Sequence, residues 1–389
     1  MKKIAIISFF HYETSLCLAK YLSKQKVNVD YYAIVDLLRD KGYVSGFEYT
    51  KASKHLGLHL LTEHEIPEIY AYTKGLNIKY YLLRILSYSN SLKFFNFLIF
   101  KCILKNISSI HYDAINIVGQ HQWVEFIHDQ LKGENIIHTL HEVGSHQNNV
   151  ASTSLINKLI KDRSKVILPS KSTAERFNSI VGSKNCRTCV IPFGKMETLL
   201  LYNKDVNLPL TIDMSKPTFL FYGFLQPYKG LDLLAKAMCE LKEDYDKFNL
   251  IVAGAGSDHN LPFFMAMPNC NVINRYLSNE EMMKLNKLAF AVLLPYKTAS
   301  QSGIVTNTYL YGKPIIGTKV GALLETIDNG DNGLLVESGD YKGFALAMKY
   351  IISDKKMYNH LCQGVKNFGC GDAYDWNAIA KDTINFMFS

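Results

Sequence analysis

Long apolar runs and a regular spacing of cysteines are missing from this sequence, and we expect no secretory leader. No apolar run approaches the roughly 20 residues of a membrane span, and the basic start MKKIAIISFFHYE is not followed by a small-residue cleavage site. The 8 cysteines are scattered through 389 residues, which favours reduced thiols over a disulfide framework. We therefore expect a cytoplasmic protein whose first residues form a buried strand.

Several kinds of functional site are missing as well. The sequence has no internal repeat, no low-complexity tract and no nucleic-acid-binding motif, and its lysine-containing turn lacks the spacing of a Walker P-loop. A single Cys186-x-x-Cys189 pair has no second pair to complete a zinc site. Asp244-Tyr245-Asp246 matches a D-x-D metal motif, but it lies between a helix and a strand, at the end of a parallel sheet that faces away from ligands. We therefore expect no nucleic acid partner, no bound metal and no cofactor.

Positive charge is concentrated in the first half of the chain. Residues 1–200 hold 25 Lys and Arg against 16 Asp and Glu, whereas residues 201–389 hold 18 against 19. The excess predicts an anionic partner, such as an acidic membrane surface or a phosphorylated lipid. Residues 79–107 mix aromatic and aliphatic side chains with four lysines and an arginine. That composition fits a helix lying on an anionic membrane, or a helix pair packed on a sheet with its lysines outside.

Strand and helix patterns alternate along almost the entire chain. Apolar runs bounded by turn residues predict six strands in each half, at 3–8, 29–34, 114–118, 135–140, 165–168 and 188–191, and at 218–222, 248–253, 272–273, 289–294, 314–317 and 333–336. Two successive series of strands and helices imply two parallel sheets with helices on both faces. We therefore predict an α/β fold of two Rossmann-like domains, residues 1–200 and 201–373, followed by a last helix at 374–389.

The most informative stretch is FYGFLQPYKGLDLLAKAM at residues 221–238. A short apolar strand breaks at Gly223, the chain turns and presents Lys229, and an amphipathic helix follows. Turn amides, a helix N-terminus and a lysine together can hold a phosphate; the alternative is an exposed lysine on an ordinary turn. A second helix is predicted to open at Ser302-Gly303 after a strand, and its unpaired amides strengthen the phosphate interpretation.

These two stretches resemble the C-terminal domain of the retaining glycosyltransferases of family 4 (glycosyl transferases group 1), which have the GT-B fold. The positions that match the family's motifs are Gly223, Lys229-Gly230, Gly312-Lys313-Pro314, and Val320-Gly321 with Glu325. With two further segments of the first half, the likeness covers most of residues 136–348, and it extends weakly over the rest of the chain. Three positions depart from the family pattern: Phe224 stands where arginine is usual, and Ala299 and Asn307 stand where glutamates are usual.

The resemblance implies a transferase that takes part in polysaccharide synthesis. The donor would be a nucleoside diphosphate sugar, such as a UDP-sugar, and the acceptor a glycan or a lipid-linked glycan. Transfer would retain the anomeric configuration and need no metal. In the GT-B fold the donor lies in the cleft between the domains, mostly on the second one, and the last helix crosses back to the first domain.

Two residues are expected to act in catalysis. Lys229 would neutralise the leaving diphosphate. His141 follows a predicted strand at the edge where open α/β sheets bind ligands, so it would face the sugar or the acceptor; the alternative is a hydrogen-bonded histidine at a strand end. Donor contacts are expected at Gly223, Gln226, Arg275, Tyr276, Ser302, Gly303, Ile304, Asn307 and Glu325, and acceptor contacts at His11, Tyr12 and His121.

Two other functions remain open. A sugar-nucleotide 2-epimerase shares the fold, but it would need acidic residues beside the sugar, where this chain has Ala299 and Asn307. A non-catalytic nucleotide-binding partner in a glycan assembly complex fits the loss of both carboxylates, whereas Lys229 argues for an enzyme. A lipid-linked acceptor would also bring the protein to the inner face of the membrane as a peripheral protein.

Overall fold

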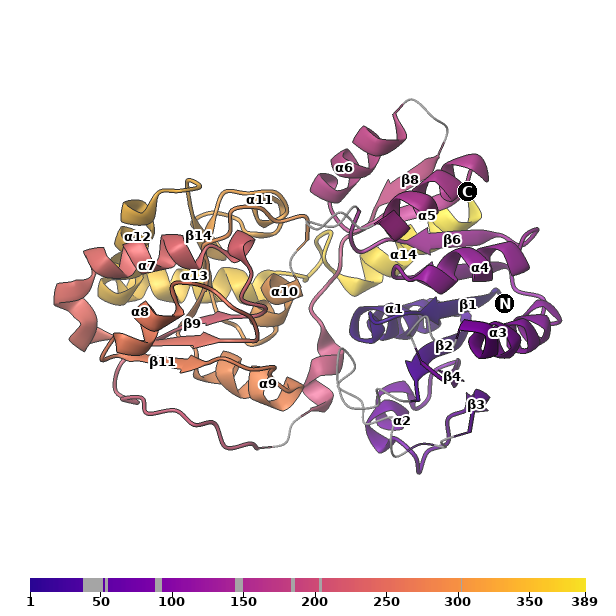
Figure 1. Cartoon of the computed structure of the whole chain (residues 1–389), viewed down its shortest axis with the longest axis horizontal. Helices are drawn as coiled ribbons and strands as arrows, with labels where there is room; N and C mark the ends of the chain where they lie inside the picture. Colours follow the sequence, from indigo (N-terminus) through magenta and orange to yellow (C-terminus); the bar gives the residue numbers. More distant parts are fainter. Residues whose placement is uncertain are drawn as a thin grey trace. The chain divides into compact units, whose positions relative to one another are not determined.

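The computed structural model describes residues 1–37, 52, 55–87, 93–143, 150–182, 186–202, 205–301 and 303–389, and the side chains of residues 150–152 are not described. The chain divides into two compact units, residues 1–201 with 371–389, and residues 202–370 (Figure 1). Each unit contains one sheet with helices packed against it, and all twelve predicted strands are present. The predicted α/β class is therefore confirmed.

The first unit is built on an eight-stranded sheet in the order β3-β4-β2-β1-β5-β6-β7-β8. The antiparallel pairing of β3 with β4 is the exception in an otherwise parallel sheet. The central strand β1 reads KIAIIS and buries nearly every side chain, as expected where helices cover both faces of a parallel sheet. The strands are β1 (Lys3–Ser8), β2 (Asn28–Asp36), β3 (Gly57–Leu60), β4 (Ile78–Ile85), β5 (Ala114–Val118), β6 (Ile136–Thr139), β7 (Lys165–Leu168) and β8 (Arg187–Val190).

The last helix of the chain belongs to this first unit, as the fold prediction required. Helix α14 packs on α1, and Trp376 Nε1 at its start donates a hydrogen bond to the Lys195 carbonyl over 2.8 Å. Gly194 makes this approach possible, because a Cβ there would lie 2.7 Å from Trp376 Nε1. The helices of the unit are α1 (Tyr12–Lys24), α2 (Pro67–Thr73), α3 (Lys93–Ser108), α4 (Gln122–Gln130), α5 (Val150–Lys161), α6 (Lys171–Val181), the 3-10 helix η3 (Glu197–Leu201) and α14 (Trp376–Phe388).

The interpretation of residues 79–107 as helical throughout is wrong. Residues Ile78–Ile85 form strand β4, and the helix begins only at Lys93. Strand β4 pairs with β2 so that Tyr80 lies opposite Tyr31 and Tyr81 opposite Tyr32, and both tyrosine pairs bring their ring centroids within 5 Å. Such cross-strand aromatic pairs stabilise a sheet, and aromatic residues favour strands over helices.

The second unit is built on a six-stranded parallel sheet in the order β11-β10-β9-β12-β13-β14. The strands are β9 (Thr218–Tyr222), β10 (Asn249–Ala253), β11 (Cys270–Ile273), β12 (Ala291–Leu294), β13 (Ile315–Thr318) and β14 (Gly333–Val336). The helices are η4 (Pro227–Lys229), α7 (Leu231–Glu240), η5 (Lys242–Lys247), α8 (Leu261–Ala266), α9 (Asn279–Leu288), α10 (Gly303–Leu310), α11 (Leu323–Thr326), α12 (Tyr341–Ser353) and α13 (Lys355–Asn367). The strand order is that of the Rossmann fold, which binds nucleotides where the order reverses.

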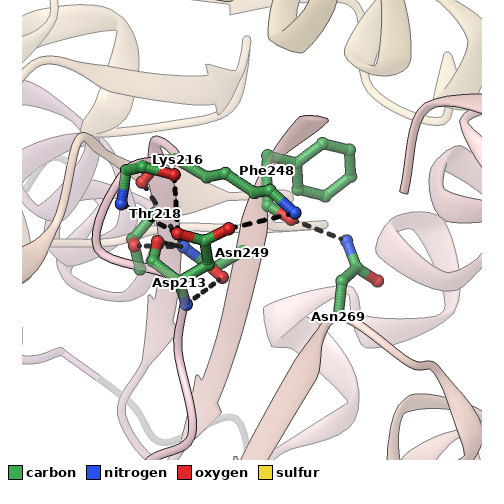
Figure 2. A network of polar contacts seen from close by, with 7 residues as sticks. Asp213, Lys216, Thr218, Phe248, Asn249 and Asn269 are labelled. Carbon is green, nitrogen blue, oxygen red and sulfur yellow. Dashed lines mark hydrogen bonds and ion pairs between the residues drawn. The ribbon is translucent and has the colours of Figure 1, made fainter. Parts of the chain in front are cut away.

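A polar network fixes the chain that enters the second sheet at the amino ends of its strands (Figure 2). The Asn249 amide nitrogen donates to the Asp213 carbonyl over 2.8 Å and to Thr218 Oγ1 over 3.1 Å, while its oxygen accepts from the Asp213 amide over 3.1 Å. Asp244, from the D-x-D motif, lies in η5, before β10, and pairs with Lys247 and Lys349. Among the described residues, no group of three or more His, Cys, Asp or Glu could hold a metal ion.

Candidate functional site

In each sheet the parallel strands reverse their order at one point, and the predicted site residues lie in loops along the carboxyl edge that contains this point. In the second sheet the reversal lies between β9 and β12, and in the first sheet between β1 and β5. Loops that follow adjacent strands at such a point diverge to opposite faces and leave a crevice at the carboxyl edge.

The loops at the carboxyl edge of the second sheet pack backbone against backbone. A Cβ on Gly254 would lie 1.7 Å from the Gly223 carbonyl oxygen, and a Cβ on Gly230 would lie 1.8 Å from the Pro295 carbonyl oxygen. All three glycines have positive φ, at 146°, 123° and 75° for Gly254, Gly223 and Gly230, a region that other residues enter only with strain. Gly223 and Gly230 were predicted from the sequence, whereas Gly254, which directly follows β10, was not.

Lys229 lies in this packed edge, between two tyrosines. Its Nζ donates a hydrogen bond to the Tyr296 hydroxyl over 2.7 Å and lies 3.9 Å from the centroid of that ring. The Tyr228 ring centroid is 5.1 Å away. Because Lys229 is buried, cation–π contact and the hydrogen bond fix the position of its ammonium group. Tyr296, which lies two residues after the end of β12, was not predicted from the sequence.

The loops after β9 and β11 bring two exposed aromatic residues together. The Phe224 side chain is 51% exposed, and its ring centroid lies 6.3 Å from that of Tyr276. Arg275, predicted to border the base, forms a two-pronged ion pair with Glu281, at 2.6 and 2.8 Å. Glu281 also completes the capping box of α9 with Ser278, so in this structure the Arg275 guanidinium supports a helix start.

Helix α10 begins beside the Gly223 turn. The side chain of Ile304, in its first turn, would be 3.0 Å from a Cβ on Gly223. Ser302 lies outside the described residues, and Gly303 is the first residue of the helix. The Asn307 Oδ1 atom is buried and has no hydrogen-bond partner among the described residues, which is unusual for a buried acceptor and is consistent with a ligand contact.

The two other predicted donor contacts lie in the same set of loops. The backbone amide of Gln226 donates to the Phe224 carbonyl, and the Gln226 carbonyl accepts from the Lys229 amide. Glu325 lies in α11, whose preceding residue, Ala322, donates its amide to the Ala299 carbonyl over 2.8 Å. The loops that follow β9, β12 and β13 therefore meet at one edge of the second unit.

The carboxyl edge of the first sheet is aromatic and rich in histidine. Phe10 follows β1 with a φ of 64°, a conformation that is uncommon for a bulky residue and concentrates at functional sites. The loop after β5 comes close to it, because a Cβ on Gly119 would lie 2.4 Å from the Phe9 carbonyl oxygen and 3.2 Å from His11 Cδ2. The chain thus brings the ends of β1 and β5 into direct contact.

His141 lies in a stack of rings at this edge. Its ring centroid is 3.4 Å from that of His11, with 4° between the planes, and 4.5 Å from that of Phe193. His141 is 4% exposed, and its Nε2 atom has no hydrogen-bond partner among the described residues. Burial, with a contribution from His11, holds the pKa of His141 well below its usual range, and burial lowers the pKa of His11 to about 4. Both rings are therefore neutral near pH 7.

The two remaining acceptor candidates have structural contacts. The Tyr12 side chain is buried, and its hydroxyl donates to the Ile34 carbonyl. His121 caps α4, where its Nδ1 accepts from the Trp123 amide over 3.3 Å, and its ring stacks on Phe9. A small cavity beside His141, with room for about one water molecule, is lined by residues that include Thr14, Ser15 and Phe193.

Residues 208–368 match the sequence model of the family Glycosyl transferases group 1. Among curated proteins, the chain is 25% identical over 230 residues to Uncharacterized glycosyltransferase MJ1607 of Methanocaldococcus jannaschii, covering 57% of this chain and 58% of that protein. It is 26% identical over 189 residues to D-inositol 3-phosphate glycosyltransferase of Corynebacterium aurimucosum, covering 45% and 44%. The matches thus span less than two thirds of these relatives.

The likeness to solved structures extends over nearly the whole chain. Sucrose-phosphate synthase from Thermosynechococcus elongatus superposes with a TM-score of 0.68 at 17% identity, covering 99% of this chain and 98% of that one. HepE from Anabaena, solved with UDP and glucose, superposes with a TM-score of 0.60 at 15% identity, covering 99% of each chain. The fold is GT-B. In both units the predicted residues therefore lie at the carboxyl edges of GT-B sheets.

Proposed function

We propose that this protein is a glycosyltransferase of family 4 that moves a sugar from a nucleoside diphosphate sugar to a glycan or a lipid-linked glycan. The observation that carries the proposal is Lys229, a buried ammonium group fixed between two tyrosines at the switch point of a Rossmann sheet. This edge lies within the residues that match the glycosyltransferase family. Similar folds solved with UDP and with UDP-glucose support a UDP-sugar as the donor.

The second unit would hold the nucleotide through neutral and cationic groups. Lys229 would offset the charge that develops on the leaving diphosphate, and the free amides at the start of α10 would donate to phosphate oxygens. Asn307 would form hydrogen bonds with the ribose through an amide that both donates and accepts. Phe224 supplies no charge, so this site depends on Lys229 more heavily than a site that also has arginine.

The first unit would position the acceptor and the sugar. His141 is neutral, so its unpartnered Nε2 would form one hydrogen bond with a sugar or acceptor hydroxyl. In a retaining transfer of this kind the acceptor enters on the face from which the diphosphate leaves. The proposed reaction relies on Lys229 and backbone amides to stabilise the diphosphate and requires no divalent cation.

Turnover of radiolabelled nucleotide sugars tests the proposal. A transferase releases nucleoside diphosphate and labels the acceptor only when a glycan acceptor is present, and it retains this activity in EDTA. Conversion of the sugar nucleotide without acceptor would instead identify an epimerase. Nucleotide binding without turnover of any donor and acceptor pair would indicate that the protein is a non-catalytic binding partner, and it would contradict the proposal.

A further inference from the structure

The first unit exposes a group of large apolar side chains on two neighbouring elements. Among the described residues, seven exposed large hydrophobic side chains lie on α3, on β3 or directly before β3. We call them the α3–β3 surface; its members are Leu56, Leu58, Leu60, Phe94, Phe95, Phe97 and Leu98. Contiguous exposed apolar groups of this kind mark interaction sites more often than isolated ones do.

The sheet register places both elements on one face. In the antiparallel pair of β3 with β4, Leu58 lies opposite Leu83 and Leu60 opposite Tyr81, and directly opposed residues project to the same side of a sheet. Leu83 and Tyr81 pack in the core cluster that also contains Phe100 of α3. Leu58 and Leu60 therefore lie on the α3 side, and α3 itself contacts β3 (Figure 1).

After the exposed Lys93, the exposed face of α3 changes from aromatic to cationic along its length. Phe94, Phe95 and Leu98 are 69%, 55% and 48% exposed. They are followed by the exposed Lys101 and Lys105, and α3 contains no acidic residue. A soluble partner protein with an apolar surface would not require the lysines, whereas aromatic side chains beside lysines are typical of a helix at an anionic lipid interface.

The surface adjoins the carboxyl edge of the first sheet. The buried Asn96, in the first turn of α3, accepts from the Leu86 amide over 2.9 Å and donates to the Ser87 carbonyl. Leu86 and Ser87 directly follow β4, so the aromatic end of α3 is tied to the edge on which His11 and His141 lie. Phe97 also packs on Phe126 of α4, at 5.0 Å between ring centroids.

We propose that the α3–β3 surface docks this protein reversibly on bilayers with anionic headgroups, with the phenylalanines at the headgroup boundary and Lys101 and Lys105 against the lipid charge. Docking of this kind needs no glycosyl transfer. If the proposed transferase function also holds, the geometry brings the histidine edge of the first unit close to acceptors carried in the membrane.

Vesicle flotation of the full chain tests the docking. We expect binding to phosphatidylcholine vesicles that contain phosphatidylglycerol, weaker binding at high salt, and little binding to phosphatidylcholine alone. The double variant Lys101→Gln/Lys105→Gln replaces two lysines with neutral residues. Because each lysine near the membrane surface contributes about 1 kcal/mol to binding, the variant should bind about 30-fold more weakly. Phe94→Ser/Phe95→Ser should weaken it by at least about tenfold.

Matched controls lie on exposed helices of the second unit. Leu346→Ser/Tyr350→Ser on α12 and Lys355→Gln/Lys356→Gln on α13 alter side chains of the same kinds and should bind as the wild type does. All variants should melt at the wild-type temperature, since each altered side chain is exposed. Absence of binding, equal binding to uncharged vesicles, or equal losses in the controls would overturn the proposal. So would a dimer in light scattering that Phe94→Ser/Phe95→Ser dissociates, because the surface would then bind a second copy.

Discussion

The two sheets place chemically different groups at equivalent points of their topology. At the switch point of the second sheet, glycines with positive φ let loops pack closely around the ammonium group of Lys229. At the switch point of the first sheet, neutral histidines stack on one another and on phenylalanines. A diphosphate needs cationic charge and backbone amides, whereas an uncharged hydroxyl needs a single oriented hydrogen bond. Under the proposed function, the donor would therefore bind to the second unit, and the sugar or acceptor hydroxyls would contact the first.

Among the changes proposed here, removal of the Lys229 ammonium group should have the largest effect on activity. We expect Lys229→Ala to lower kcat by about 100-fold, since loss of one group that stabilises developing charge costs roughly 3 kcal/mol. The matched control is Lys247→Ala, because Lys247 is an exposed lysine that precedes β10 at the amino ends of the same sheet's strands. Steady-state kinetics with saturating donor measures kcat for both variants. A wild-type kcat in Lys229→Ala would show that Lys229 does not take part in catalysis.

A change in the first unit should affect a different kinetic parameter. His141→Phe keeps a neutral ring between His11 and Phe193 but removes Nε2, so we expect kcat/KM for the acceptor to fall about tenfold or more. The affinity for UDP should stay at the wild-type value, because the donor nucleotide is assigned to the other unit. Calorimetry measures the affinity for UDP. A loss of this affinity in His141→Phe would contradict the assignment of the donor nucleotide to the second unit.

The buried histidines should make the first unit acid-sensitive. Burial lowers the pKa of His11 and His121 to about 4 and that of His138 to about 3, so below about pH 6.5 the unfolded chain takes up protons that the native state does not. The free energy of unfolding should therefore fall as the pH falls from about 6.5 towards 4, by about 1 kcal/mol per pH unit or more.

The positions of the tryptophans allow the acid sensitivity of the first unit to be measured separately from the second unit. The two tryptophans of the chain, Trp123 and Trp376, both belong to the first unit, so their fluorescence follows its unfolding alone. The second unit has two histidines, His259 and His360, and both are exposed. Denaturant titrations at several pH values should thus show a tryptophan transition that moves to lower denaturant in acid; a transition independent of pH would contradict the burial argument.

Asn307→Ala should have the smallest effect. An uncharged hydrogen bond contributes roughly 1 kcal/mol, so donor affinity should fall about fivefold with little change in melting temperature. Asn367→Ala, an exposed asparagine on α13, is the control. A large drop in melting temperature with unchanged donor affinity would mean that Asn307 supports the fold and does not contact the ribose.

The comparison also explains which parts of the structure could be predicted from the sequence. The turn that carries Gly223 and Lys229 is local, because its strand, turn and helix follow one another within residues 218–240. Periodicity and turn chemistry were therefore enough to find it. Tyr296, which orients Lys229, lies 67 residues away in the sequence, and no local pattern connects two such residues.

The first unit was predicted less completely than the second. Strand β3 was overlooked although Leu58 and Leu60 alternate as in a strand, because it is only 4 residues long and pairs with β4 alone, at the edge of the sheet. The stack of His11 on His141 joins loops that follow β1 and β6. Position at strand ends indicated each histidine separately, but their contact depends on the sheet order.

Calorimetric titration of nucleotides tests the central assignment most directly. UDP and GDP, with the matching monophosphates, are titrated into the wild type and Lys229→Ala. If Lys229 holds the diphosphate, the variant should lose about tenfold or more in affinity for the diphosphate that binds best, the cost of one charge-assisted hydrogen bond, and bind the monophosphate nearly as the wild type does. Equal losses for both nucleotides, or no binding of any nucleoside diphosphate to the wild type, would contradict the account.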